Sequence, residues 1–183
     1  MLNPNSTLPV ITDRLMIRML TRDDQEHIYN LCLQAFNNDW PSGWRMDYEQ
    51  ASNFLDWQIN KYETFNVLTD SVYFAVVARD NSNFIGHCHV GCIDELAETE
   101  IGYGIAKEFR GVGYATEVAK ALTQWALSTF NLKYVVATIT DDNPSSLRVI
   151  EKVGFLKYGK MKIPSMDENK IFNYFRYYNQ IVK

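Results

Sequence analysis

The sequence has 183 residues, 46% of them hydrophobic and 22% charged, which is typical of a soluble globular protein long enough to bury a real core. Its net charge of −4 argues against nucleic acid as the main partner. No apolar run approaches the ~20 residues of a membrane-spanning helix, and the start, MLNPNSTLPV, lacks the basic and apolar regions of a signal peptide. Three cysteines do not make a disulfide framework, so we expect a cytoplasmic protein. From the chain length we expect a single domain over residues 1–183, with 1–11 as an N-terminal extension.

The first part of the chain predicts four strands and two helices. Alternating and β-branched residues indicate strands over 15–20, 72–78, 84–93 and 99–106. A helix capped by Thr21 or Asp23 follows the first strand, and a second helix is expected over 47–65. Asn and Asp residues at 80–83 indicate a hairpin turn, and residues 94–98 form an acidic connection.

A loop is expected over residues 36–45, from their Asn, Pro and Gly content. It carries Trp40 and Trp44. Two interpretations of these tryptophans are open, because they either pack on the surface or form the wall of a pocket.

The second part predicts strand, glycine-rich turn and long helix, and then a second strand and helix. The second strand covers 134–140, Asn143 caps the following helix with Pro144 at its first position, and Gly154 ends that helix. Two closing strands are expected over 155–159 and 171–178. This order indicates an α+β fold with antiparallel strands first and a β-α-β-α segment after them.

The glycine-rich turn, which precedes a helix starting at Tyr114, is typical of an anion-binding site. Free N–H groups point outward at a helix start, where the helix dipole adds positive charge. A P-loop is excluded because no lysine follows Gly113 in the required place. A dinucleotide-binding turn is disfavoured because Thr116 stands where its third glycine belongs.

The turn instead matches Arg-x-x-Gly-x-Ala over residues 110–115, which resembles the acyl-CoA loop of the GNAT superfamily of N-acetyltransferases. Residues 143–155 (NPSSLRVIEKVGF) resemble the second signature of that family. Residues 12–18 (TDRLMIR) resemble the opening strand of its ribosomal-protein N-terminal (alanine) acetyltransferase branch. The resemblance therefore covers residues 12–177. It implies a mixed, mostly antiparallel central sheet of about six to seven strands with helices on both faces.

The resemblance implies that acetyl-CoA is the acyl donor and that no metal is needed. The pyrophosphate would be held by the backbone amides of the glycine loop, with the Arg110 side chain closing over it: Arg110, Gly111, Val112, Gly113, Tyr114, Ala115 and Thr116. The pantetheine arm would pair like an added strand along Tyr103, Gly104 and Ile105, and the Ile105 amide is the candidate donor to the thioester oxygen.

Glu100 occupies the place from which a strand glutamate acts as general base in several members of this family. A partly buried carboxylate there would take the amine proton directly or through water. The alternative is that Glu100 binds a cationic substrate or has a structural role. Both interpretations are open at this point.

For the leaving thiolate, the chain departs from the common pattern of the family. Ile150 stands where many relatives have a tyrosine, so we expect Ser146 to donate a proton or hydrogen bond, or simply to bond the backbone of its helix. The helix start would also stabilise a thiolate. Asn143 has two possible roles, as a cofactor contact and as a helix cap.

The segment His87-Cys88-His89-Val90-Gly91-Cys92 does not predict a metal site. On a strand, the two histidines face one side and the two cysteines face the other, so four ligands cannot converge. A packed histidine, or one histidine that contacts the acceptor, remains as an alternative.

Charge is distributed unevenly along the chain. Residues 1–100 carry 6 Lys and Arg against 15 Asp and Glu, whereas residues 101–183 carry 12 against 7. An acidic first half suits a cationic acceptor and a basic second half suits an anionic donor. We therefore expect an N-acetyltransferase that acts on a protein N-terminal α-amine or a small amine, as a monomer or homodimer, with no nucleic acid or membrane partner. The alternative is a non-catalytic acyl-CoA-binding sensor on the same fold.

Overall fold

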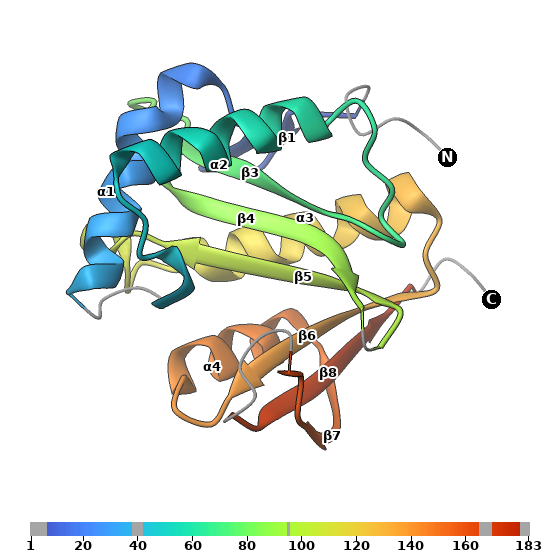
Figure 1. Cartoon of the computed structure of the whole chain (residues 1–183). Helices are drawn as coiled ribbons and strands as arrows, with labels where there is room; N and C mark the ends of the chain where they lie inside the picture. The colour runs from blue at the N-terminus through green and yellow to red at the C-terminus, as the bar shows by residue number, and fades with distance from the viewer. Residues whose placement is uncertain (1–6, 38–41, 95, 165–169, 180–183) are drawn as a thin grey trace.

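The computed structural model describes residues 7–37, 42–94, 96–164 and 170–179. Its eight strands form one sheet in the order β1-β2-β3-β4-β5-β6-β8-β7 (Figure 1). All neighbouring strands are antiparallel except β5 and β6, which are parallel. The strands are β1 (Val10–Ile11), β2 (Leu15–Met19), β3 (Ser71–Ala78), β4 (Phe84–Ile93), β5 (Glu98–Ile105), β6 (Tyr134–Thr140), β7 (Leu156–Met161) and β8 (Phe172–Tyr178).

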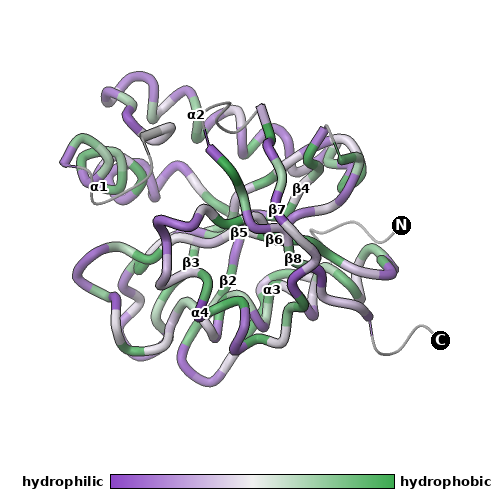
Figure 2. Tube along the Cα trace, turned by 90° about the horizontal axis from the view of Figure 1, so that it is seen from below, coloured by the Kyte–Doolittle hydropathy of each residue, from purple (hydrophilic) through white to green (hydrophobic). Residues whose placement is uncertain are grey.

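Helices cover both faces of the sheet, as Figure 2 shows. On one face lie α1 (Gln25–Phe36) and α2 (Tyr48–Lys61), and on the other lie α3 (Tyr114–Phe130) and α4 (Pro144–Val153). The mixed sheet with helices on both faces is therefore confirmed. The strand number is eight rather than six to seven, because two residues of β1 are too few to show an alternating pattern.

Two hydrophobic cores result from the alternation of side chains along the central strands. Phe74 and Cys88 face α3 and pack in the larger core. Ala75 and Val77, the next residues of β3, face α1 and α2 and pack in the second core. A third, smaller cluster on the α1–α2 face lies over β6 and β8 and includes Val136, Ile163 and Tyr174.

The parallel pairing between β5 and β6 is limited to one position. Glu100 of β5 pairs with Val136 of β6, and the two strands then diverge toward their C-terminal ends (Figure 1). The chain leaves the end of β5 to begin α3 and leaves the end of β6 to begin α4. The N-termini of both helices therefore lie at the open end of the divergence.

Several predicted bounds shift by a few residues. A 3₁₀ turn over Arg22–Asp24 precedes α1, and α2 ends at Lys61 rather than at residue 65. The acidic residue Glu98 is already part of β5. Trp40 lies outside the described residues. None of the helices in the described part of the chain is long and apolar enough to cross a membrane.

A charged pair ties β2 to the start of α1. Arg18 donates from Nη1 and Nη2 to the two carboxylate oxygens of Asp24, both at 2.7 Å, and the Thr21 N–H donates to Asp24 Oδ2 at 2.8 Å. Burial alone would raise the pKa of Asp24, but the bonds from Arg18 and Thr21 outweigh it and lower that pKa. Asp24 is 1% exposed, so its charge depends on these donors.

We expect Asp24→Asn to lower the free energy of unfolding at pH 7 by roughly 2–4 kcal/mol, less than for a fully buried pair because Arg18 keeps contact with water. Because the folded pKa of Asp24 is depressed, its contribution is complete above the unfolded pKa of about 4 and is lost as pH falls through the lower folded value. Urea unfolding of both proteins at pH 7 and pH 3 measures this, and the difference should shrink at pH 3.

A matched control is Asp56→Asn, which breaks the exposed pair that Asp56 makes with Arg22. It should change the free energy of unfolding by less than about 1 kcal/mol. Equal losses for the two variants would contradict a special role for the Arg18–Asp24 pair.

Candidate active site

The glycine loop turns tightly into the start of α3. Gly111 and Gly113 have φ values of +85° and +91°, in the left-handed region that L side chains rarely adopt. The first helical bond of α3 runs from the Glu117 N–H to the Gly113 carbonyl at 3.2 Å. The amides that precede Glu117 in the first turn therefore have no partner within the helix and are available to a ligand.

Arg14 supports this loop from its side. Its Nε and Nη2 both lie 2.7 Å from Glu117 Oε2, and its Nη1 donates to the Val112 carbonyl at 3.0 Å. The guanidinium also lies 4.6 Å from the centre of the Tyr114 ring. By holding the Val112 carbonyl, Arg14 fixes the orientation of the loop. Sequence analysis did not assign this role, because Arg14 and Glu117 are 103 residues apart.

Arg110 is engaged at the end of β5. Its Nε donates to the Ile105 carbonyl at 2.8 Å. The expectation that this side chain closes over a pyrophosphate stays a prediction. The contact places a guanidinium at the end of β5, and the loop residues Val112 and Gly113 that follow in the chain are exposed.

The edge of β5 that faces β6 is open beyond Glu100. The Ala106 N–H donates to the Ile85 carbonyl, which makes Ile85–Ala106 a hydrogen-bonded pair in the β4–β5 register. Because such pairs alternate, Ile101, Tyr103 and Ile105 turn their backbone groups away from β4 and toward β6. Only the Glu100–Val136 position is paired between β5 and β6, so the backbone groups of Tyr103 and Ile105 point into the divergence.

Glu100 lies at the point where the two strands separate. Its residue is 6% exposed, and its Oε1 accepts from the Thr138 N–H at 3.0 Å and from the Thr138 hydroxyl. Its other oxygen, Oε2, lies 3.9 Å from His89 Nε2. One carboxylate oxygen is therefore held by β6, and the other faces the histidine.

His89 reaches Glu100 because the neighbouring strand has a glycine. A Cβ on Gly102 would lie 2.1 Å from His89 Cε1, so only glycine leaves room for the imidazole over β5. The Tyr73 ring lies 4.8 Å from His89. Burial and the nearby Glu100 carboxylate raise the pKa of the Tyr73 hydroxyl to about 12, so this phenol stays protonated at pH 7.

An aromatic wall continues from His89 along the α1–α2 face. We use this name for Trp44, Phe54, Tyr73, His87 and His89. Trp44 stacks on His87 with ring centres 4.3 Å apart. Burial, and to a smaller extent the neighbouring His89, lower the pKa of His87 well below its ordinary value, so His87 is neutral at pH 7. Trp44 is half-buried and packs against the rest of this wall, and its role as the wall of a pocket stays a prediction.

The start of α4 faces the same divergence from the other side. Asn143 Oδ1 accepts from the Ser146 N–H at 3.1 Å and from the Ser145 hydroxyl at 3.0 Å, which confirms its capping role. The Tyr103 hydroxyl donates to the Ser146 carbonyl at 3.4 Å, and burial raises the pKa of Tyr103. Ile150 is fully buried, so the position of the family's tyrosine belongs to the core here.

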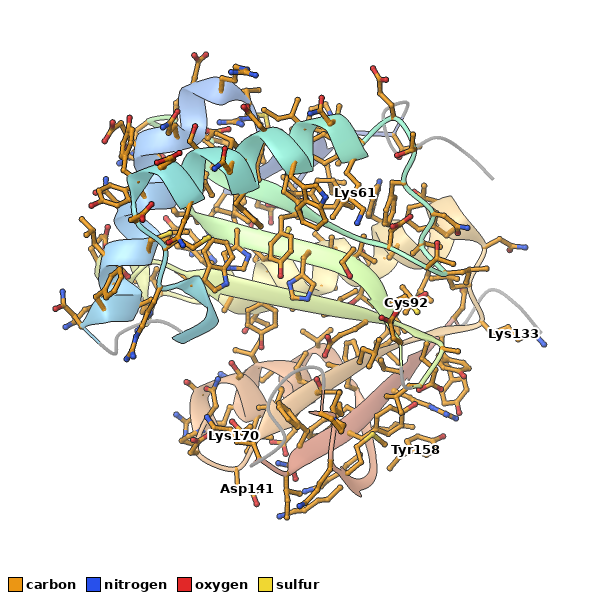
Figure 3. The ribbon with its side chains drawn as sticks, viewed as in Figure 1. Lys61, Cys92, Lys133, Asp141, Tyr158 and Lys170 are labelled. Atoms are coloured by element: carbon orange, nitrogen blue, oxygen red, sulfur yellow. The ribbon has the colours of Figure 1, made fainter. Side chains whose placement is uncertain are left out.

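Ion pairs tie the connection between β6 and α4 to β7 and to the residues before β8. Lys160 pairs with Asp141, and Lys170 Nζ lies 3.5 Å from Asp142 Oδ2. Figure 3 shows Asp141 and Lys170 together at this end, on the side away from Tyr158 and Lys133. In the part of the chain that the structure describes, no three His, Cys, Asp or Glu side chains gather as a metal site.

Comparison with known protein families shows to which family the chain belongs. The family model described as an acetyltransferase (GNAT) domain matches residues 14–156. The chain belongs to the GNAT acetyltransferase family. Uncharacterized N-acetyltransferase YoaA of Bacillus subtilis is 28% identical over 155 residues, which cover 82% of this chain and 84% of YoaA.

Two solved structures show the same fold. Ribosomal-protein-S5-alanine acetyltransferase from Vibrio fischeri has a TM-score of 0.72 at 18% identity and covers 96% of this chain and 99% of that chain. The microcin self-immunity acetyltransferase MccE, in complex with acetyl-CoA and AMP, has a TM-score of 0.74 at 16% identity and covers 92% and 94%. The expected likeness to ribosomal-protein acetyltransferases is therefore confirmed at the level of fold.

In this GNAT domain, most of the predicted site residues surround one divergence. Strand β5 contains Glu100, Tyr103 and Ile105, and the glycine loop follows it. Strand β6 is followed by Asn143 and Ser146. Sequence analysis missed Arg14 and Thr138, which act through contacts between distant parts of the chain. The single signal for Arg14 was its place in the segment that resembles the opening strand of the family.

We expect Arg14→Ala to weaken acetyl-CoA binding about 5- to 10-fold, because the Val112 carbonyl loses its charged donor and the loop is no longer fixed. Isothermal titration of the full chain with acetyl-CoA measures the effect. Arg22→Ala is the matched control, since it removes an arginine from the exposed pair with Asp56. An unchanged affinity in Arg14→Ala would show that the loop holds its shape without this support.

Proposed function

We propose that this protein is an acetyl-CoA-dependent N-acetyltransferase that transfers the acetyl group to a primary amine by direct attack. The observation that carries the proposal is the buried Glu100 carboxylate at the point where two parallel strands separate. An open strand edge and two helix N-termini lie on the donor side of this point. An aromatic wall lies on the other side.

The donor's parts would contact three features of the chain. The amides from Arg110 to Thr116 would hold the pyrophosphate, since a glycine loop before a helix start favours this anion. The open backbone groups of Tyr103 and the Ile105 N–H would pair with the amide-containing pantetheine arm, whereas the Ile105 carbonyl already accepts from Arg110. Gly104 lies between these two residues and pairs with His87 of β4. Asn143 and Ser146 at the start of α4 would border the thioester end.

Glu100 would take the proton from the attacking amine. The amine would attack in its neutral form, after its ammonium proton has passed to water. As its nitrogen bonds to the acyl carbon, the carbon–sulfur bond breaks, the CoA thiolate leaves, and one N–H proton passes to Glu100 Oε2 directly or through water. This oxygen suits the role because Oε1 already accepts two bonds from Thr138. The Ile105 N–H, which points into the divergence, would stabilise the negative charge on the acyl oxygen.

The leaving thiolate would be stabilised at the start of α4. Ser146 is half-buried there, and the helix dipole favours negative charge at the same place. Tyr103 is a second candidate donor, since its protonated hydroxyl lies 3.4 Å from the Ser146 carbonyl. We favour Ser146, because the Tyr103 hydroxyl already donates to that carbonyl.

The acceptor would be an amine that is cationic before it reacts. Glu100 is the carboxylate that would attract it, because the neighbouring Glu98 is neutralised by Arg176 at 2.7 Å and by bonds from Tyr134 and Tyr174. The aromatic wall would surround the group that carries the amine. Both a protein α-amine and a small amine fit this description, and the Vibrio fischeri relative is named for a ribosomal protein.

A sensor that binds acyl-CoA without transferring the acyl group is the alternative from another class. The buried carboxylate between an open strand edge and an aromatic wall favours the enzyme. The single domain over 1–183, the cytoplasmic location and the monomeric or homodimeric state stay predictions.

We expect Glu100→Gln to lower kcat about 10²- to 10⁴-fold, because glutamine cannot accept the amine proton. Release of the CoA thiol, followed with a thiol reagent across a panel of peptides and small amines, measures turnover. Glu151→Gln removes one charge from an exposed position of α4 and is the control. Full activity in Glu100→Gln would remove the base assignment, and acetyl-CoA binding without turnover on any amine would favour the sensor.

Ser146→Ala should lower kcat about 10-fold with little change in the KM for acetyl-CoA, since the hydroxyl would act on charge that develops as the thiolate leaves. Tyr103→Phe should lower kcat less. Steady-state kinetics of both variants separate the two donors. A larger loss of kcat in Tyr103→Phe would assign the proton donor to the phenol instead.

A further inference from the structure

The end of the β5–β6 ladder has a specific chemical cause. Val136 is paired with Glu100. If the parallel ladder continued, the next hydrogen bond would run from the Thr138 N–H of β6 to the Ile101 carbonyl of β5. That second position is not part of the register. The Thr138 N–H instead donates to Glu100 Oε1 at 3.0 Å, and the Thr138 hydroxyl donates to the same oxygen. The side chain of Glu100 has replaced a backbone carbonyl of its own strand.

We propose that Glu100 and Thr138 form a clasp that stops the β5–β6 ladder after one pair and so keeps the strand edge from the Ile101 carbonyl to the Ile105 N–H open for the acyl donor. This inference rests on the proposed function for its ligand, but the clasp itself is a property of the free protein. It makes Thr138 a positioning residue and gives Glu100 a second role, separate from proton transfer.

Two physical reasons support the clasp. Thr138 is half-buried, and its backbone N–H needs a hydrogen-bond partner. Without Glu100, this N–H would donate to the Ile101 carbonyl, and β5 and β6 would pair further. A carboxylate acceptor makes bonds roughly twice as strong as a neutral carbonyl does, so the open arrangement wins. The next pair to form on closing would engage the Tyr103 N–H, which is the group proposed to bind the pantetheine arm.

The orientation of Glu100 is also fixed by its other neighbours. Glu100 and His89 lie on the α1–α2 face, where Gly102 leaves room for the imidazole. The carboxylate thus lies between His89 on one side and Thr138 on the other. It stays directed at β6 through Oε1 while Oε2 faces the acceptor side.

The test compares variants that separate the clasp from the base. Glu100→Gln keeps an oxygen that accepts from Thr138 and loses the base, whereas Glu100→Met loses both. Backbone amide exchange of the free full-length protein, followed by NMR, reports whether the Tyr103 N–H becomes paired. Isothermal titration with acetyl-CoA reports the consequence for the donor.

We expect the Tyr103 amide to exchange at least about 10-fold more slowly in Glu100→Met than in wild type, because the strands close. Affinity for acetyl-CoA should fall about 10-fold in the same variant, which corresponds to one closed backbone pair. Glu100→Gln should change both readouts in the same direction but less than Glu100→Met, because its amide oxygen still accepts from Thr138 but carries no charge, while its turnover falls. Equal exchange and equal affinity in all three proteins would overturn the clasp.

Thr138 provides a second test if Glu100→Met does not fold. Thr138→Val removes the hydroxyl donor and should shift Tyr103 exchange and acetyl-CoA affinity in the same direction by about 3-fold, whereas Thr138→Ser should restore both. Wild-type Tyr103 exchange and wild-type acetyl-CoA affinity in Thr138→Val would contradict the clasp. If wild type does not bind acetyl-CoA, the proposed function fails, and the exchange comparison still decides whether the clasp exists.

Discussion

The interruption of one parallel ladder governs the arrangement of everything around the candidate site. β5 and β6 share a single pair, Glu100–Val136, and then separate. Because α3 and α4 follow the separated ends, their N-termini approach the same space from two strands. Continued pairing would place the backbone groups of Tyr103 in a sheet and leave the glycine loop as an ordinary strand-to-helix turn. The loop's conformation therefore matters only because the strands beside it stay apart.

In the proposed reaction, β5 would serve two substrates, because alternation divides its residues into two sets. Tyr103 and Ile105 turn their backbone groups toward the divergence. The Glu100 side chain points to the α1–α2 face, where it lies beside His89. Gly102 has no side chain on the same face and so leaves room for the imidazole. In the proposed reaction, the donor would be held by the first set and the acceptor by the second. The reacting atoms would then meet across the thickness of one strand, so small shifts of β5 would affect both substrates together.

The features that the sequence predicted correctly are those with local causes. The glycine turn before α3 and the Asn143 cap depend on residues within one or two turns of each other, and both are present. The strands of the central sheet have clear alternation. What remained hidden depends on contacts between distant residues, such as Glu100 with Thr138, which are 38 residues apart, and Tyr103 with Ser146, which are 43 apart. No local pattern encodes which donor a buried carboxylate will meet.

The two carboxylate oxygens of Glu100 have different partners, so this position restricts the residue type more than the proposed general-base role alone would. Oε1 accepts from the N–H and hydroxyl of Thr138, and Oε2 lies 3.9 Å from His89 Nε2. An aspartate would be one methylene shorter, so it could not reach β6 and still face His89 from the same backbone position. A glutamine can reach β6 but cannot accept a proton. Of the acidic and amide side chains, glutamate is the one that would meet both demands, since the proposed strand separation and the proposed proton transfer would use the same carboxylate.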